Sequence, residues 1–234
     1  MLHHKKGLVS FDITVKETNL NIQAEKDLTD RAIISVIACR HHLETFIQGF
    51  PEFATSFSPI RKPGLAMPKI ITDMIEAAQV AQVGPMAAVA GAVAEYTGTQ
   101  LMGCSGQVIV ENGGDIFIKS ESDTILSIYA GDSPFSMTTG IRVKKNDCPY
   151  GICTSSGTFG HSKSFGKADA VTVLSDSCVL ADAVATKLCN MVQNPADIRE
   201  AIQAGKTISG IRGVVIIKGD NIGLWGKLEL VKFS

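Results

Sequence analysis

The sequence lacks the features that would place it in a membrane, in a secretory route or on nucleic acid. It has no apolar run of the length that a membrane span needs. Its basic start, Met1 to Lys6, is not followed by the apolar region of a signal peptide, so we expect a cytoplasmic protein. The formal net charge of −1 gives no support for a nucleic-acid or membrane-surface role.

Paired cysteines and the common nucleotide and hydrolase motifs are also missing. The six cysteines form no CxxC pair, and the closest two, Cys148 and Cys153, are separated by Pro-Tyr-Gly-Ile. We therefore expect reduced, mostly buried thiols rather than a zinc site, which uses short paired spacings. No P-loop, no GxGxxG after a strand, no GxSxG and no HExxH is present.

What the chain does have is the composition of a globular protein. Of its 234 residues, 45% are hydrophobic and 19% are charged. This is long enough to bury a core, and we expect residues 1–234 to form a single domain. Strands and helices do not alternate regularly, which favours an α+β fold with mainly antiparallel sheet. The expected strands are 8–15, 19–22, 107–110, 116–118, 124–130, 138–143, 168–174, 208–217 and 222–230, the last two as a final hairpin.

Helical periodicity appears in five segments, at 29–50, 68–82, 86–101, 178–192 and 195–204. Residues 51–67, rich in Pro, Phe, Ser and Gly, read as a connection. Arg40-His41-His42 lies inside the first helix, and we interpret it as a polar face rather than a set of ligands. The helix at 86–101 is crowded with Ala and Gly, including Ala87 and Gly91. Either tight packing or an anion at the helix start explains such residues.

The first motif is Asn112-Gly113-Gly114-Asp115, which stands between two apolar runs. Asn-Gly in this setting is a strong hairpin signal. Glycines also let a ligand approach the backbone closely, because they carry no Cβ. A plain turn and a ligand contact both remain open.

The second motif is the polar segment 151–166, which contains Ser155-Ser156-Gly157 and the only histidine beyond residue 42, His161. A segment that merely linked two elements would not need a histidine. The unperturbed pKa of histidine, near ~6.5, would let His161 accept a proton at neutral pH.

The third motif is Ala-Asp-Ala-Val-Ala-Thr, which carries Asp182 and Thr186. In a helix, residues four apart project from one face. A carboxylate and a hydroxyl so placed can hold one hard cation such as Mg²⁺. The alternative is that Asp182 simply favours the helix N-terminus. Asp176 or Ser177 is expected to cap this helix.

At these motifs the chain resembles the ApbE-like flavin transferases, and more closely a shorter, cytoplasmic branch of that superfamily. The resemblance runs over roughly residues 84–192. It implies a fold of two T-fold-like halves with antiparallel sheets and packed helices. The implied activity moves FMN from FAD onto a Thr or Ser hydroxyl of a target protein, with Mg²⁺ and with release of AMP.

The resemblance also implies roles for individual residues. His161 would be the catalytic histidine. Asp182 and Thr186 look like the metal-binding Asp-x-x-x-Thr, with a backbone carbonyl supplied by Ala87. The positions implied to contact the flavin nucleotide are Asn112, Gly113, Gly114, Asp115, Ser155, Ser156, Gly157 and Gly91.

The sequence departs from the family pattern in three places. The His-x-x-Asp-Pro-x-Thr-Gly motif is absent, a lysine of the third-helix motif is replaced by Ala90, and there is no lipoprotein signal. Two alternatives therefore stay open: a flavin- or nucleotide-binding protein without turnover, and a hydrolase that splits FAD with water. We expect a flavin nucleotide and an acceptor protein as partners. The small-residue helices and the final hairpin would suit a homodimer.

Overall fold

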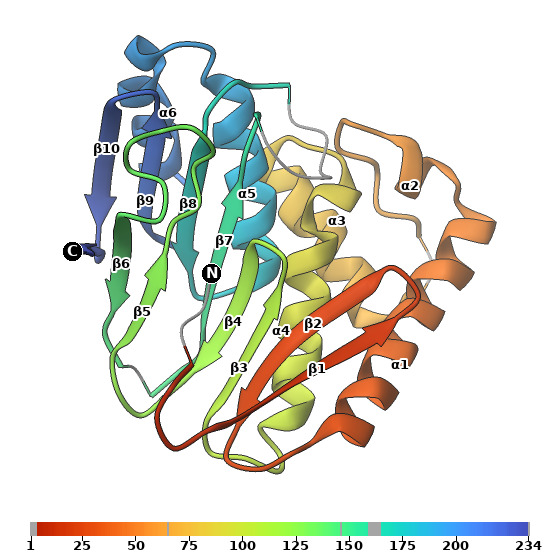
Figure 1. The fold of residues 1–234 in the computed structure, drawn as a ribbon. Coiled ribbons are helices and arrows are strands. Elements are labelled where there is room, and N and C mark those ends of the chain that lie inside the picture. The colour runs from red at the N-terminus through yellow and green to blue at the C-terminus, as the bar shows by residue number, and fades with distance from the viewer. Residues whose placement is uncertain (1–3, 65, 146, 159–164, 234) are drawn as a thin grey trace.

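A long antiparallel sheet organises the protein. The structure is a computed structural model that describes residues 4–64, 66–145, 147–158 and 165–233. Eight strands lie in the order β1-β2-β3-β4-β7-β8-β9-β10, and every neighbouring pair is antiparallel. Helices cover one face of this sheet (Figure 1). The mixed helical and antiparallel fold expected from the sequence is therefore confirmed.

The sheet consists of two halves with the same plan, a hairpin, then helices, then a second hairpin. The first half comprises β1 (Val9–Val15), β2 (Thr18–Ala24), α1 (Thr29–Gly49), α2 (Glu52–Thr55), α3 (Lys69–Ala81), η1 (Pro85–Ala88), α4 (Val89–Leu101), β3 (Val108–Asn112) and β4 (Asp115–Lys119). The second comprises β7 (Tyr150–Ser155), β8 (Ala170–Ser175), α5 (Cys178–Met191), η2 (Pro195–Asp197), α6 (Ile198–Lys206), β9 (Ile211–Lys218) and β10 (Asn221–Gly226). The halves meet where β4 pairs with β7.

The central strands bury both faces of the sheet, because successive side chains along a strand point to opposite sides. On β3, Val110 packs into the core beneath the helices, whereas Ile109 joins a second core. That second core is covered by a three-stranded sheet in the order β11-β6-β5, formed by β5 (Thr124–Ser127), β6 (Thr139–Val143) and β11 (Glu229–Lys232). Strands such as β8, buried at every residue, therefore read as continuous apolar runs.

The predicted final hairpin is wrong at its C-terminal end. The second strand was expected to run over 222–230, but β10 ends at Gly226 and β11 pairs with β6 in the smaller sheet. Gly226 has φ +99°, and a Cβ there would lie 2.2 Å from the Arg212 carbonyl oxygen. The chain thus turns away at a position that only glycine tolerates.

The helix boundaries differ in smaller ways. The helix expected at 86–101 opens as the 3₁₀ turn η1 before α4 begins, and the connection 51–67 contains α2. Residues 150–155, most of which we placed in the polar segment, form β7. Within the described part of the chain, no single helix is long and apolar enough to cross a membrane; α3 and residues 85–101 pass that test only together, as a pair bent by 104°.

Candidate functional site

The site forms where α4 crosses the start of α5, above the seam between β4 and β7. Gly91 lies at this crossing. A Cβ at Gly91 would be 2.4 Å from the Cys178 carbonyl oxygen and 2.8 Å from the Cβ of Asp182. A side chain would therefore push the two helices apart, so the crossing needs glycine. The small residues of α4 serve close packing here.

Each of the two helices caps the other. Asp182 of α5 accepts a hydrogen bond from the Gly91 N–H at 2.8 Å, and the Ala90 N–H also bonds this carboxylate. Glu95 of α4 accepts bonds from the N–H groups of Cys178 (2.6 Å) and Val179 (3.1 Å). Helix N-termini leave such N–H groups without a partner in the helix, so a carboxylate stabilises them. The Asp182 carboxylate bonds the start of α4, not that of its own helix.

The N-cap of α5 is Ser177. The sequence analysis predicted that either Asp176 or Ser177 would cap this helix. Its hydroxyl accepts a bond from the Leu180 N–H at 3.3 Å. The same hydroxyl donates to Glu95 at 2.9 Å. The N-terminus of α5 is therefore held by two side chains, one from each helix. This fixes the turn of α5 from which Asp182 projects.

Asp182 shares the site with a second buried carboxyl, that of Asp115 at the start of β4. Both residues are 8% exposed. Burial, and the nearby charge of Asp115, raise the pKa of Asp182 well above its usual value, although the Ala90 and Gly91 N–H groups oppose this. Burial raises the pKa of Asp115 to about 7. Among the described residues, no Lys, Arg or His forms a salt bridge with either carboxyl.

Polar groups on the neighbouring elements surround this pair. Thr186 lies one turn beyond Asp182 on α5, and its hydroxyl is 3.2 Å from that of Ser155 at the end of β7. The Asn112 side-chain amide donates to the Ala90 carbonyl at 3.0 Å. Asn112 thereby ties the end of β3 to the first turn of α4. The structure thus brings residues from all three sequence motifs around the start of α4.

The glycine pair forms the predicted hairpin turn. Asn112 pairs with Asp115 across it. Gly113 has φ +65° and open space within 4 Å of a would-be Cβ, whereas a Cβ on Gly114 would lie 2.5 Å from the Thr154 carbonyl oxygen. Turn geometry accounts for Gly113, and the close approach of β7 accounts for Gly114. The open space beside Gly113 still leaves its backbone accessible to a ligand.

Three other predicted site residues lie on neighbouring segments of the chain. Ser156 and Gly157 stand at the base of the loop after β7, where the Gly157 N–H bonds the Ala168 carbonyl at 2.9 Å. Ala87 lies in η1, one residue before Ala88, the N-cap of α4. The predicted catalytic residue, His161, lies outside the described residues.

The donor set suits a hard cation. Asp115, Asp182, Thr186 and Ser155 offer only oxygen atoms, the ligands that Mg²⁺ prefers. No group of three or more His, Cys, Asp or Glu able to hold a metal occurs in the described parts of the chain. Mg²⁺ usually binds through one or two carboxylates and completes its shell with waters and substrate phosphates. Two buried carboxyls without a cationic partner are the observation that fits a bound ion.

The sequence analysis did not identify two parts of the site. Glu95 carried a signal, because it is the one charged residue in the apolar stretch 89–101. The other is the thiol pair of Cys153 and Cys178, whose sulfur atoms are 3.4 Å apart beside Asp115. Burial raises the pKa of both thiols, that of Cys178 to about 11, so both stay protonated. The prediction that the cysteines are free and mostly buried is confirmed.

Comparison with known proteins identifies the family of this chain. A model of the family described as AbpE bacteria matches residues 1–224. The UPF0280 protein of Methanococcus aeolicus is 38% identical over 237 residues, covering 98% of this chain and 92% of the relative. A UPF0280 protein of Methanococcus maripaludis is 44% identical over 228 residues, covering 94% of this chain and 92% of the relative.

The fold is also found among solved structures. The apo form of the flavinyl transferase ApbE from Pseudomonas stutzeri matches with a TM-score of 0.60, at 14% identity, over 94% of each chain. At this identity the likeness shows the fold alone. The resemblance recognised from the motifs is thereby confirmed at the level of the family. The chain belongs to the AbpE bacteria family.

Proposed function

We propose that this protein is a Mg²⁺-dependent flavin transferase that moves FMN from FAD to a Thr or Ser hydroxyl of a target protein and releases AMP. The observation that carries the proposal is the pair of buried carboxyls, Asp115 and Asp182, with raised pKa values and no cationic partner among the described residues. A solvated or purely packing role would not require two acids in one buried place. The fold shared with solved flavin transferases supports a flavin nucleotide as the ligand class.

The proposed site residues form two groups, one that would bind the metal ion and one that would contact the nucleotide. Asp182, Asp115 and the Thr186 hydroxyl would hold Mg²⁺, with the Ala87 carbonyl as a further candidate ligand. When bound, Mg²⁺ neutralises the charge that grows on phosphate oxygens as a P–O bond breaks. Asn112, Gly113 and Gly114 would lie along the nucleotide, because the space beside Gly113 is open. The remaining predicted contacts to FAD are Ser155, Ser156, Gly157 and Gly91.

The reaction exchanges one P–O bond for another. The acceptor oxygen attacks the phosphorus of the FMN half of FAD, and the bridging oxygen of the pyrophosphate leaves with AMP. His161 would take the proton from the attacking hydroxyl, since its unperturbed pKa lies near ~6.5. The products are a phosphodiester that joins FMN to the target, and AMP.

Two other functions use the same residues. A hydrolase would release free FMN because water replaces the protein hydroxyl. A binding protein would hold a flavin or another nucleotide without releasing AMP, and the absent Asp-Pro-x-Thr-Gly motif favours it.

A product assay separates the three. The purified chain is incubated with FAD, Mg²⁺ and cell extract, AMP and FMN are followed by chromatography, and covalent flavin is detected by fluorescence in a denaturing gel. A transferase gives AMP together with a fluorescent protein band, and His161→Ala removes both. AMP with an equal amount of free FMN and no band would show a hydrolase, and FAD that stays intact would show a binding protein.

A further inference from the structure

Strand β10 forms one edge of the eight-stranded sheet, and no strand of the described chain pairs with its outer side (Figure 1). From Asn221 to Gly226 the strand carries no charged residue, no proline and no bulge. Leu224, in its middle, is 42% exposed. Edge strands are usually protected by such features, because their free backbone groups otherwise pair with another chain. The edge of β10 is therefore open to a further strand.

The opposite edge of the sheet, strand β1, is better protected. Asp12 lies in the middle of β1 and is exposed, and Ser10 and Thr14 on either side of it are exposed and polar. A β1 strand that paired with a second copy of itself would bring Asp12 carboxylates close together, and like charges on facing strands are destabilising. Of the two edges, β10 is the one suited to pairing.

The hairpin geometry shows which backbone groups β10 presents at this edge. A two-residue turn joins β9 to β10, so the pair Lys218–Asn221 that closes the turn exchanges hydrogen bonds. Every second pair along an antiparallel ladder does so. In keeping with this alternation, the Lys227 N–H bonds the Arg212 carbonyl at 2.8 Å. The even-numbered residues of β10 therefore direct their N–H and C=O groups toward the open edge.

The side chains of β10 form a recess and a projection on the face that α6 covers. Gly223 packs directly under α6, and a Cβ there would lie 2.7 Å from the Ile202 Cδ1 atom and closer still to Ile198. A groove of about 350 Å³ runs beside this point between α6 and β10. Trp225, two residues further on, points to the same face and is half-buried, with the Lys206 Nζ atom 5.7 Å from its ring centroid.

A second copy of the chain matches the recess and the projection at the same time. When two identical strands pair antiparallel about a two-fold axis, one residue lies on the axis opposite its own copy. With Leu224 on the axis, its outward N–H and C=O exchange hydrogen bonds with those of its copy. Trp225 of each copy then lies opposite Gly223 of the other, in a pair without hydrogen bonds, where side chains come closest.

The alternative register is less favourable. With Gly223 on the axis, the two glycines would oppose each other, Trp225 would face Asn221, and the groove beside α6 would stay empty. An aromatic ring over a cross-strand glycine is a known means of fixing strand register. The side chains therefore select the register with Leu224 on the axis.

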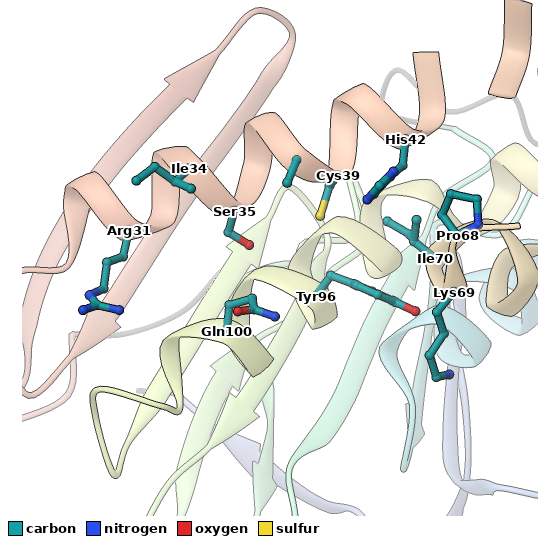
Figure 2. A pocket seen from close by; sticks show the side chains of 11 residues that line it. Arg31, Ile34, Ser35, Cys39, His42, Pro68, Lys69, Ile70, Tyr96 and Gln100 are labelled. Atoms are coloured by element: carbon teal, nitrogen blue, oxygen red, sulfur yellow. The ribbon is translucent and has the colours of Figure 1, made fainter. Parts of the chain in front are cut away.

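A hollow with apolar walls also lies between α1, α3 and α4 (Figure 2). Arg31, His42 and Lys69 line it, and none of its described lining residues is acidic. A symmetric contact there would bring basic side chains of two copies together, which opposes association. Among the described residues that line the groove beside β10, Arg199 is the one charged residue. The edge of β10 thus suits a second copy better than this hollow does.

We propose that two copies of this chain pair through β10 and form a dimer with one continuous sheet. The two-fold axis passes Leu224, and Trp225 of each copy covers Gly223 of the other beside α6. This interface is independent of the proposed flavin site, because β8 and β9 separate β10 from the seam between β4 and β7.

Sedimentation equilibrium of the full chain over a range of concentrations measures the association. We expect the parent chain to show a monomer–dimer equilibrium. Leu224→Lys should weaken it about tenfold or more, because it removes a Leu–Leu contact and sets two like charges opposite each other. Val9→Lys is the matched control, since Val9 is 43% exposed on the other edge strand, and it should leave the association unchanged. Far-UV circular dichroism shows whether both variants keep the fold.

Fluorescence tests the register, because Trp225 is the only tryptophan of the chain. As the dimer dissociates on dilution, the ring loses the cover of the second copy. We expect its emission to shift to longer wavelength and its quenching by acrylamide to increase. Leu224→Lys should already show the spectrum of the monomer at concentrations where the parent chain is dimeric.

Three results would overturn the proposal. The first is a parent chain that stays monomeric at every concentration. The second is a dimer that persists in Leu224→Lys, or that Val9→Lys dissociates, because the interface would then lie elsewhere. The third is dissociation without any change in the emission or quenching of Trp225, because the ring would then not lie against Gly223 of the second copy.

Discussion

Asp182 is the residue on which the site depends, and two physical explanations of it coexist. It caps α4 through the Ala90 and Gly91 N–H groups, and it stands beside Asp115 where a cation would be stabilised. The cap requires an oxygen acceptor, whereas the cation requires negative charge. Replacement by asparagine keeps the first and removes the second, so the two explanations are separable.

We expect Asp182→Ala to lower the free energy of unfolding by roughly 1–3 kcal/mol, because it leaves buried N–H groups unpaired. Asp182→Asn should cost less, since its side-chain oxygen can accept the same bonds. Both variants should reduce AMP release by roughly 100-fold or more through loss of charge stabilisation. Urea unfolding and the AMP assay measure the two effects. Full activity in Asp182→Asn would remove the metal role of this residue.

The buried carboxyls also give the metal-free protein a pH dependence. The pKa of Asp115 is about 7 in the folded protein, against about 3.9 for an unperturbed Asp. Between these values the folded state keeps a proton that the unfolded chain has released. Stability therefore falls as pH rises from about 4 through about 7 as Asp115 ionises. Asp182, whose pKa is also raised, adds a loss of the same sign. Carboxyls with a lowered pKa, such as Asp197, titrate below this window.

Urea unfolding in EDTA at several pH values between 4.5 and 8 checks this sign. Asp115→Asn should reduce the slope, because one of the two buried carboxyls that bind an extra proton in the folded state is gone. Added Mg²⁺ should restore stability chiefly above pH 7, where both carboxyls can ionise. Stability that rises across this interval in EDTA would contradict the raised pKa.

At the scale of elements, the crossing of α4 and α5 decides whether the site forms. Gly91→Ala places a Cβ 2.4 Å from the Cys178 carbonyl oxygen. We expect a loss of roughly 1–3 kcal/mol in unfolding free energy, as for an overpacked core, together with lost FAD binding. Gly49→Ala is the matched control, because nothing lies within 4 Å of its would-be Cβ at the end of α1. If neither Gly91→Ala nor Gly49→Ala changed the midpoint temperature of thermal unfolding, the close packing at this helix crossing would be refuted.

The N-terminus of α5 should be sensitive to Glu95. We expect Glu95→Gln to lower the unfolding free energy by roughly 1 kcal/mol, because the carboxylate that accepts from Cys178 and Val179 loses its charge. Glu76→Gln removes an exposed carboxylate paired with Lys62 and should cost less than about 0.5 kcal/mol. Chemical denaturation compares the two. A larger loss in Glu76→Gln would show that the α5 cap contributes little.

Local signals predicted local structure well. The turn at Gly113-Gly114, the cap at Ser177 and the helix expected at 178–192 each depend on neighbours within a few residues, and each is present. The 3₁₀ turn of η1, the short α2 and the transfer of β11 to the second sheet were not predicted. They depend on packing between distant segments, as the close approach of Gly226 to Arg212 shows. The bond from Glu95 to α5 spans 83 residues, and sequence periodicity carries no trace of such a pairing.

At the scale of the whole molecule, the site belongs to the seam between the two halves. Asp115 and Gly91 come from the first half, and Asp182, Thr186 and Ser155 come from the second. The pairing of β4 with β7 brings them together. Neither half could form this group of residues alone. The motifs identified the residues, but only the joined sheet shows that two acids from different halves share one buried place.

The measurement that tests the function most directly is a calorimetric titration of the purified chain with FAD, in Mg²⁺ and in EDTA. We expect binding that requires Mg²⁺, and that Asp182→Asn abolishes, with AMP appearing on longer incubation. Binding of equal strength in EDTA, unaffected by Asp182→Asn, would contradict a metal-assisted site at the seam. No binding of FAD under either condition would contradict the flavin assignment itself.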